Sequence, residues 1–116
     1  MKKIIICFDL DNTLCNTFKS DYKNSKPIKK NIKLVNDLYD KGIFIKIFTA
    51  RFMGRMNENS LKAKKMGFIM TKKQLNKWNL KYNKLIFGKP SYDLIVDDKS
   101  INFKKNWSQI LKKKYL

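Results

Sequence analysis

Four of the nine acidic residues in this 116-residue chain stand in two tight pairs, and each pair follows an apolar run. A threonine and a lysine follow two other apolar runs, so six side chains could act together: Asp9, Asp11, Thr49, Lys89, Asp97 and Asp98. Carboxylate oxygens are the hard ligands that Mg²⁺ prefers. A carboxylate can also attack phosphorus to form an aspartyl-phosphate, while a lysine ammonium offsets charge on phosphoryl oxygens.

Other kinds of site are excluded by composition. The chain has no histidine, so Ser-His catalysis, Cys-His catalysis and histidine metal ligation are all ruled out. The two cysteines, Cys7 and Cys15, do not form the pattern of a disulfide framework. Cys7 falls within an apolar run, and we expect it to be a small core residue.

Short apolar runs alternate with helical patterns along the chain. Runs rich in β-branched residues predict strands at 3–8, 43–48, 85–87 and 94–96. Apolar positions at helical spacing predict helices at 28–40, 57–66, 71–78 and 103–115. Gly42 and Gly67 are expected to end the first two helices. This order predicts an α/β fold in a single domain over residues 1–116, a three-layer Rossmann-like parallel sheet with helices on both faces.

The predicted sheet would bring the six side chains together. In an open parallel sheet, ligands bind just beyond the carboxyl ends of the strands. All four predicted strands end in these polar groups, so we expect the groups to converge on one edge of the sheet. The hydroxyl of Thr49 and the backbone N–H groups at Leu10 and Ala50 are candidates for holding phosphoryl oxygens.

The motifs resemble a known family. The stretch Asp9-Leu10-Asp11-Asn12-Thr13 is similar to the first motif, D-x-D-x-T, of the haloacid dehalogenase (HAD) superfamily. The other three motifs of that superfamily look like Thr49, Lys89 in Gly-Lys-Pro, and Asp97-Asp98. The spacings are 40, 40 and 9 residues, from Asp9 to Thr49, to Lys89 and to Asp98, and the resemblance covers nearly the whole chain.

The resemblance implies a Mg²⁺-dependent phosphatase. Asp9 would be the nucleophile and a metal ligand. Asp11 would be the general acid that protonates the leaving oxygen and then the base that activates water, and its backbone carbonyl would touch the metal. Thr49 would bind the phosphoryl group, and Lys89 would stabilise it together with Asp9.

The remaining roles come from the same resemblance. Asp98 would be the third protein ligand of Mg²⁺, and Asp97 would support it or replace it as a ligand. Arg51, just beyond Thr49, is a candidate substrate contact. Asp21 and Tyr22 lie in the loop between the first strand and the first helix and are candidate flap residues near the substrate.

A narrower resemblance concerns the substrate. Ser-Asp-Tyr at 20–22, Thr-Ala-Arg-x-Met at 49–53 and Gly-Lys-Pro at 88–90 look like small capsule or polysaccharide biosynthesis phosphatases. This implies a small sugar or polyol phosphate as substrate. The gaps between motifs leave no room for a cap domain, so the site would be open. Either the substrate is large or a second subunit covers the site, which makes a homo-oligomer one expectation.

The net charge of +18 leaves two alternatives open. Lysine supplies 25 of the 27 basic residues, and asparagine and isoleucine are also abundant, as AT-rich codons would produce. The even spread of lysines, without an aromatic platform, favours a generally basic surface over a nucleic-acid groove. A nucleic-acid end phosphatase and a non-catalytic basic binding module are the alternatives. With no targeting or membrane-spanning segment evident, a cytoplasmic protein is expected.

Overall fold

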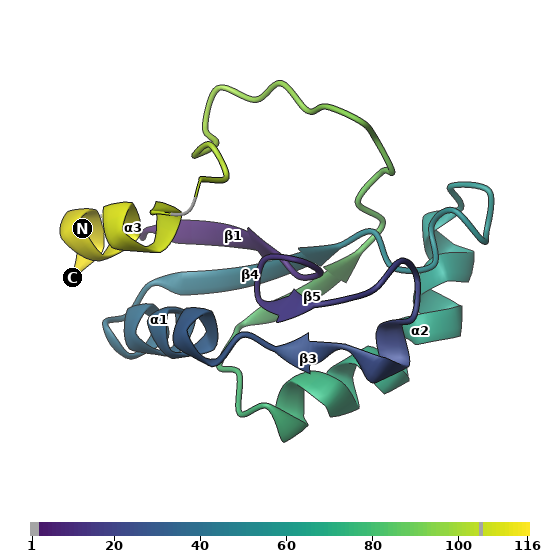
Figure 1. Cartoon of the computed structure of the whole chain (residues 1–116), viewed down its shortest axis with the longest axis horizontal. Helices are drawn as coiled ribbons and strands as arrows, with labels where there is room; N and C mark the ends of the chain where they lie inside the picture. Colours follow the sequence, from purple (N-terminus) through teal and green to yellow (C-terminus); the bar gives the residue numbers. More distant parts are fainter. Residues whose placement is uncertain (1–2, 105) are drawn as a thin grey trace.

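Three parallel strands form the sheet that organises the molecule. The computed structural model describes residues 3–104 and 106–116 (Figure 1). The sheet has the order β1-β4-β5, and a separate two-stranded antiparallel ribbon joins β2 and β3. The strands are β1 (Ile5–Asp9), β2 (Cys15–Asn16), β3 (Lys26–Pro27), β4 (Phe44–Thr49) and β5 (Lys84–Phe87). The helices are a 3-10 turn η1 (Tyr22–Asn24), α1 (Lys29–Asp40), α2 (Ser60–Lys77) and α3 (Trp107–Tyr115).

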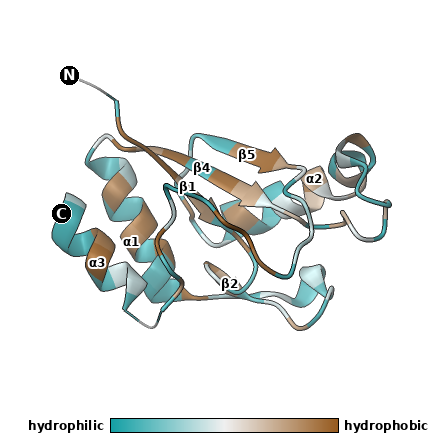
Figure 2. Ribbon diagram, turned by 90° about the horizontal axis from the view of Figure 1, so that it is seen from above, coloured by the Kyte–Doolittle hydropathy of each residue, from teal (hydrophilic) through white to brown (hydrophobic). Residues whose placement is uncertain are grey.

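Helix α1 and strands β1 and β4 follow the sequence prediction, whereas β2 and β3 form in a stretch that was expected to be a loop. Ile32, Val35 and Leu38 recur at helical spacing and are buried against the sheet. Gly42 then takes φ +92°, a left-handed conformation that ends the helix and turns the chain into β4. The predicted α/β fold with a parallel sheet is confirmed, and the bands of hydrophobic and hydrophilic residues along α1 and α3 are visible in Figure 2.

Helix α2 differs from the sequence prediction. Two helices separated at Gly67 were expected, but residues 60–77 form one continuous helix. Asn59 caps its start, because the side chain accepts a hydrogen bond from the Lys62 N–H at 3.1 Å. Gly67 is buried where the helix packs on Phe52 and Phe87, and a Cβ there would meet the Phe52 ring at 2.3 Å. The glycine therefore serves close packing and does not end the helix.

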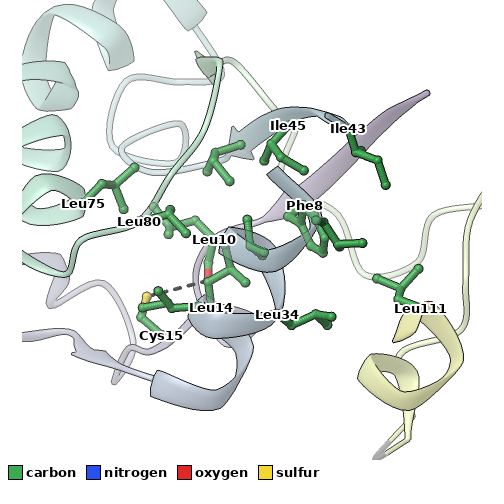
Figure 3. Packing of buried hydrophobic residues seen from close by; sticks show 14 of the residues in the cluster. Phe8, Leu10, Leu14, Cys15, Leu34, Ile43, Ile45, Leu75, Leu80 and Leu111 are labelled. Atoms are coloured by element: carbon green, nitrogen blue, oxygen red, sulfur yellow. Dashed lines mark hydrogen bonds between the residues drawn. The ribbon is translucent and has the colours of Figure 1, made fainter. Parts of the chain in front are cut away.

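The hydrophobic core lies against one face of the sheet. Phe8 and Ile45 point into it (Figure 3), and Ile47 belongs to the same buried cluster. Helices α1, α3 and the end of α2 supply further side chains, and others come from the loops. Strand residues whose side chains point to the other face of the sheet, such as Ile5, are exposed or half-buried. Among the described residues, the prediction of helices on both faces thus holds for one face only. The prediction that Cys7 is a core residue is wrong, because its side chain is exposed on the uncovered face.

The chain between β5 and α3 is the other departure from prediction. Residues 94–96 were expected to form a strand, but they form no regular structure, and Leu94 and Val96 are 81% and 92% exposed. Figure 1 shows this stretch arcing away from the sheet. A run of three apolar residues gains few ladder hydrogen bonds, which limits its stability as a parallel strand. Helix α3 is shorter than predicted, and no helix among the described residues is long and apolar enough to cross a membrane.

Gly67→Ala should destabilise the fold. The added methyl group would clash with Phe52 and also approach Phe87 at 3.3 Å. Overpacking of this kind costs about 1–3 kcal/mol, which exceeds the gain of about 1 kcal/mol in helix propensity. We expect urea denaturation to show a lower free energy of unfolding.

Gly54→Ala is the matched control, because no atom lies within 4 Å of a Cβ built there. Its free energy of unfolding should change by less than about 0.5 kcal/mol. A Gly67→Ala variant more stable than the parent chain would contradict the close packing of α2.

Candidate active site

The carboxyl ends of the three parallel strands meet at one edge of the sheet. In the register of the sheet, Asp9 lies opposite Phe48, and Thr49 lies opposite Phe87. Asp9 therefore ends β1 beside Thr49 at the end of β4, and Lys89 follows β5 by two residues. The prediction that these strand ends converge is confirmed for the three strands that form.

Asp9 and Lys89 form an ion pair at this edge. The Lys89 Nζ lies 3.2 Å from Asp9 Oδ1, and Thr13 Oγ1 donates a longer hydrogen bond of 3.4 Å to Asp9 Oδ2. The backbone N–H of Lys89 donates to the Thr49 carbonyl at 3.2 Å, which fixes where the lysine leaves the sheet. The side chain of Asp9 is 37% exposed, so a ligand can reach its carboxylate.

The charge of Lys89 is stabilised by its neighbours. Burial lowers the pKa of Lys89, but a hydrogen bond with Tyr92 and the charge of Asp9 outweigh this effect. The net pKa lies above the ordinary lysine value. The ammonium group is therefore charged at neutral pH, as a group that binds phosphoryl oxygens must be.

Asp11 is held by a buried arginine. Arg51 Nη2 donates to Asp11 Oδ1 at 2.9 Å, and Arg51 Nε donates to Oδ2 at 3.0 Å and to Oδ1 at 3.2 Å. Thr17 Oγ1 donates a further hydrogen bond of 2.5 Å to Oδ1. A forked guanidinium–carboxylate contact of this kind fixes both the position and the plane of the carboxylate.

The other donors of Arg51 are also engaged. Its Nη1 donates to Gln74 Oε1 at 2.6 Å and to Thr71 Oγ1 at 3.3 Å, and Nη2 donates to Ser25 Oγ at 3.3 Å. The guanidinium carbon lies 5.1 Å from the centre of the Tyr22 ring. The side chain is 0% exposed. Direct contact between Arg51 and a substrate would require these bonds to break, so the geometry makes Arg51 a positioning residue for Asp11.

The residues around Arg51 join the loop after β1 to helix α2. Ser25 and Thr17 share a hydrogen bond of 2.6 Å between their hydroxyl groups, and both are buried. Gln74 Nε2 donates to the Tyr22 carbonyl at 2.9 Å. Thr17, Ser25 and Gln74 were not identified from the sequence. They belong to no motif, and their contacts with Asp11 and Arg51 form only when the loop after β1 folds over Arg51.

The other predicted phosphate-binding residues lie around the same edge. Thr49 is fully buried, and its Oγ1 accepts a hydrogen bond from the Arg51 N–H at 3.0 Å, which leaves the hydroxyl proton free to donate. Leu10 is buried and Ala50 is half-buried, each directly after its strand. Asn12 takes φ +63° in the turn that carries Asp11 away from β1. Contact of Leu10 and Ala50 with a phosphate stays a prediction.

The second aspartate pair is not brought to this edge. Asp97 and Asp98 are exposed in the stretch between β5 and α3. Asp97 Oδ1 accepts from the Lys99 N–H at 2.9 Å, which holds a local turn. Over residues 3–104 and 106–116, no group of three or more carboxylate, thiol or imidazole side chains is close enough to hold a metal ion.

The two flap residues predicted from sequence lie apart from Asp9. Asp21 is exposed and accepts two hydrogen bonds, of 3.1 Å and 3.0 Å, from the Asn24 side chain. Tyr22 is half-buried, and its ring meets Phe52 edge-on with 4.9 Å between the ring centres. Tyr22 thus anchors the flap to the loop after β4, and a contact of either residue with substrate stays a prediction.

The fold has a counterpart among solved structures. The crystal structure of a structural-genomics target from Vibrio cholerae matches with a TM-score of 0.78 and 26% sequence identity, over 96% of this chain and 98% of that one. A chain of the Pnkp1/Rnl/Hen1 RNA repair complex matches at 18% identity over 97% of this chain and 30% of that one. Its TM-score of 0.49 is too low to support an argument. No protein-family model matches the chain, and neither does any curated protein.

Replacing Arg51 should cost much more stability than replacing the other arginine. Arg51→Met leaves the Asp11 carboxylate without its fork of donors inside the protein. Breaking a buried ion pair in this way costs about 3 kcal/mol or more. Arg51→Lys keeps the charge but not the fork, and we expect an intermediate loss.

Arg55→Met is the matched control, since Arg55 is exposed, donates a hydrogen bond of 3.0 Å to the Ser20 carbonyl and lies over the Tyr22 and Phe52 rings. Its free energy of unfolding in urea should change by less than about 1 kcal/mol. Equal losses for Arg51→Met and Arg55→Met would refute the role of Arg51 as the anchor of Asp11.

Proposed function

We propose that this protein is a Mg²⁺-dependent phosphomonoester hydrolase of the HAD type that acts through an aspartyl-phosphate on Asp9. The observation that carries the proposal is the arrangement of Asp9, which is accessible, paired with a charged lysine, and two residues from an aspartate held by an arginine. The order and spacing of the four sequence motifs support the same chemistry.

The proposed reaction has two displacements. The Asp9 carboxylate attacks the phosphorus of a monoester, and the bond from phosphorus to the ester oxygen breaks. Asp11, in its protonated form, gives its proton to the departing oxygen, which leaves as an alcohol. Water then attacks the phosphorus of the aspartyl-phosphate and gives a proton to Asp11. The bond to Asp9 breaks, and inorganic phosphate leaves.

The hydrogen bonds of Asp11 leave one of its oxygens available to exchange the proton in the two proposed displacements. Oδ1 accepts bonds from Thr17 and from two nitrogens of Arg51. Oδ2 accepts only from Arg51 Nε at 3.0 Å. A carboxylate oxygen has about two lone-pair sites, so Oδ2 retains one for the proton. Arg51 and Thr17 would in this way orient Asp11 for both displacements.

Two oxygen donors at the edge, the Asp9 carboxylate and the Asp11 backbone carbonyl, suit Mg²⁺. The residues that would hold the ion are Asp9, the backbone carbonyl of Asp11 and, as third ligand, Asp98. All three provide the hard oxygens that Mg²⁺ requires. When bound, the ion would stabilise negative charge on the phosphoryl oxygens. Of the second pair, Asp97 holds a local turn, which favours Asp98 as the direct ligand and leaves Asp97 as support or alternative.

Asp98 would reach the site if residues 94–96 paired with the outer edge of β1. Within the described residues β1 pairs only with β4, and Ile5 near its start is 52% exposed. Leu94, Ile95 and Val96 are exposed as well. Full burial of each large aliphatic side chain contributes about 1.5–3 kcal/mol. A parallel strand at that edge would end at Asp97 and Asp98, beside the end of β1.

The substrate we propose is a small sugar or polyol phosphate of polysaccharide synthesis. This rests on the narrower motif resemblance at 20–22, 49–53 and 88–90. The accessible Asp9 suits a substrate that enters from solvent, and the basic surface would attract any phosphate ester. The alternative substrate, a phosphorylated nucleic-acid end, uses the same chemistry at Asp9.

Phosphate release from a panel of phosphomonoesters tests the reaction. The panel contains sugar phosphates, nucleotides and 3′-phosphorylated oligonucleotides, each with and without Mg²⁺. Release should require Mg²⁺ and should fall at least about 10³-fold in Asp9→Asn, since the nucleophile is lost.

Asp37→Asn, a surface carboxylate paired with Lys33, is the matched control and should keep full activity. Equal activity of Asp9→Asn and the parent chain would exclude the aspartyl-phosphate. The best member of the panel decides between the metabolite and the nucleic-acid substrate.

Asp98→Asn tests the third metal ligand. Its half-saturating Mg²⁺ concentration should rise about tenfold or more, as for loss of a ligand contact. Asp97→Asn should have a smaller effect, and Asp93→Asn, an exposed carboxylate on the same stretch, should have none.

Hydrogen exchange supplies an independent readout of the same proposal. The amides of 94–96 should become protected when Mg²⁺ is added to the parent chain, and less so in Asp98→Asn. Unprotected amides at saturating Mg²⁺ would rule out the added strand.

A further inference from the structure

Two adjoining hollows lie between the start of α1 and the end of α2, away from Asp9. One has a volume of about 460 Å³ and is bounded by residues 23–26 and by the C-terminal half of α2. The other, of about 400 Å³, continues along α1 to Asn36. Both are lined by Lys77 and Trp78, so they form one groove. In Figure 1 the end of α2 runs beneath β3.

The groove is lined by lysines. Six of them border it, and all are exposed: Lys23, Lys26, Lys29, Lys33, Lys73 and Lys77. Neither hollow has an acidic residue in its lining. Lys33 forms an ion pair with Asp37, and the other five form none with the described residues. We call this surface the lysine groove. It concentrates positive charge that the protein itself does not neutralise.

An aromatic ring stands where the two hollows meet. Trp78 packs against the hydrophobic core and also lines both hollows, and it is half-buried, so part of its side chain remains accessible. Lys73 and Lys77 are four residues apart on α2 and thus project on the same side, next to this ring. The even spread of lysines along the sequence did not reveal this arrangement, because the two sides of the groove come from segments about fifty residues apart.

The floor of the groove touches the Arg51 network. Ser25 and Gln74 line the larger hollow, and both accept hydrogen bonds from Arg51, which also donates to Asp11. The groove is therefore a separate surface, connected to the candidate active site through the hydrogen bonds of Arg51. Binding there requires neither Asp9 nor a metal ion.

We propose that the lysine groove binds a single strand of nucleic acid, with lysines on the phosphates and a base stacked on Trp78. Single-strand sites combine a positive groove along the backbone with aromatic rings on which bases stack. A ligand with phosphates but no bases would contact the lysines and would not use the accessible part of Trp78. Five unpaired lysines predict a salt slope of about −3.5, or an affinity about 100-fold weaker at about 200 mM salt than at about 50 mM.

Fluorescence anisotropy with a labelled oligothymidylate of about 12 nucleotides tests the groove. Binding should show the salt dependence given above. The variant Lys23→Gln/Lys26→Gln/Lys73→Gln/Lys77→Gln should lose most of the slope and bind at least about tenfold more weakly.

A matched variant removes the same charge elsewhere. Lys62→Gln/Lys65→Gln/Lys112→Gln/Lys113→Gln changes four exposed lysines that do not line either hollow, and it should keep nearly all of the affinity. Equal losses in the two quadruple variants would overturn the proposal in favour of a diffuse basic surface.

The fluorescence of Trp78 distinguishes binding of a nucleic-acid strand from binding of a polyanion without bases. In a Trp107→Phe background Trp78 is the only tryptophan, and its fluorescence should be quenched by the oligonucleotide but not by inorganic polyphosphate. Quenching by neither ligand, or equal competition by polyphosphate, would overturn the assignment to nucleic acid. Trp78→Leu should weaken oligonucleotide binding about tenfold, with circular dichroism to verify the fold.

The Asp9→Asn variant tests nucleic-acid binding independently of the proposed phosphatase activity. The variant should bind the oligonucleotide as tightly as the parent chain, whether or not the protein releases phosphate from any ester. Loss of binding in Asp9→Asn, with an intact fold, would place the strand in the candidate active site and overturn the separate groove.

Discussion

The buried contact between Arg51 and Asp11 is the constraint on which the site depends. A guanidinium with no exposed surface is costly unless every donor is paired, and here the partners come from the loop after β1 and from α2. The loop must therefore fold back over Arg51 before the cation is satisfied. Once it has, the Asp11 carboxylate is fixed in position and plane, close to Asp9, which the end of β1 places within reach of Lys89. One long-range ion pair thus sets the geometry of residues that lie far apart in sequence.

The hydrogen bonds of Arg51 hold the loop after β1 in place, whereas residues 90–104 are exposed. Lys89 is tied to the sheet through its N–H and the Thr49 carbonyl. Residues 90–104 are then exposed, and Trp107 packs against Phe8 of β1. The groups that would attack and orient a phosphate are preorganised without any ligand, whereas the second aspartate pair lies within the exposed stretch. Metal binding would then be coupled to ordering of that stretch, with part of the binding free energy offsetting the lost conformational entropy.

The sequence predicted the elements whose signals are local. The strand ends at Asp9 and Thr49 and the helix that stops at Gly42 follow from apolar periodicity and glycine conformation, and they appear as expected. The failures have a common cause in tertiary contacts. A glycine such as Gly67 often ends a helix, but here the absence of a side chain allows the helix to pack closely on Phe52. Arg51 stood beside Thr49 in sequence and suggested a substrate contact, yet its burial depends on a loop that closes only in the folded chain.

The positions of paired and unpaired lysines show where the positive charge of the protein is not neutralised. The protein has three times as many basic as acidic residues, and several of those acids are already paired within the structure. Most lysines therefore repel one another, which destabilises the compact state and makes any bound anion stabilising. Codon composition can explain how many lysines there are, but not why five unpaired ones border a groove that also exposes Trp78. The groove is linked to Asp11 through Ser25, Thr17 and Arg51, and Asp9 does not line it. A polyanion held there would therefore only slightly lower the positive potential that attracts a second anion to Asp9. The proposed binding at the groove and the proposed chemistry at Asp9 could therefore be lost independently of each other.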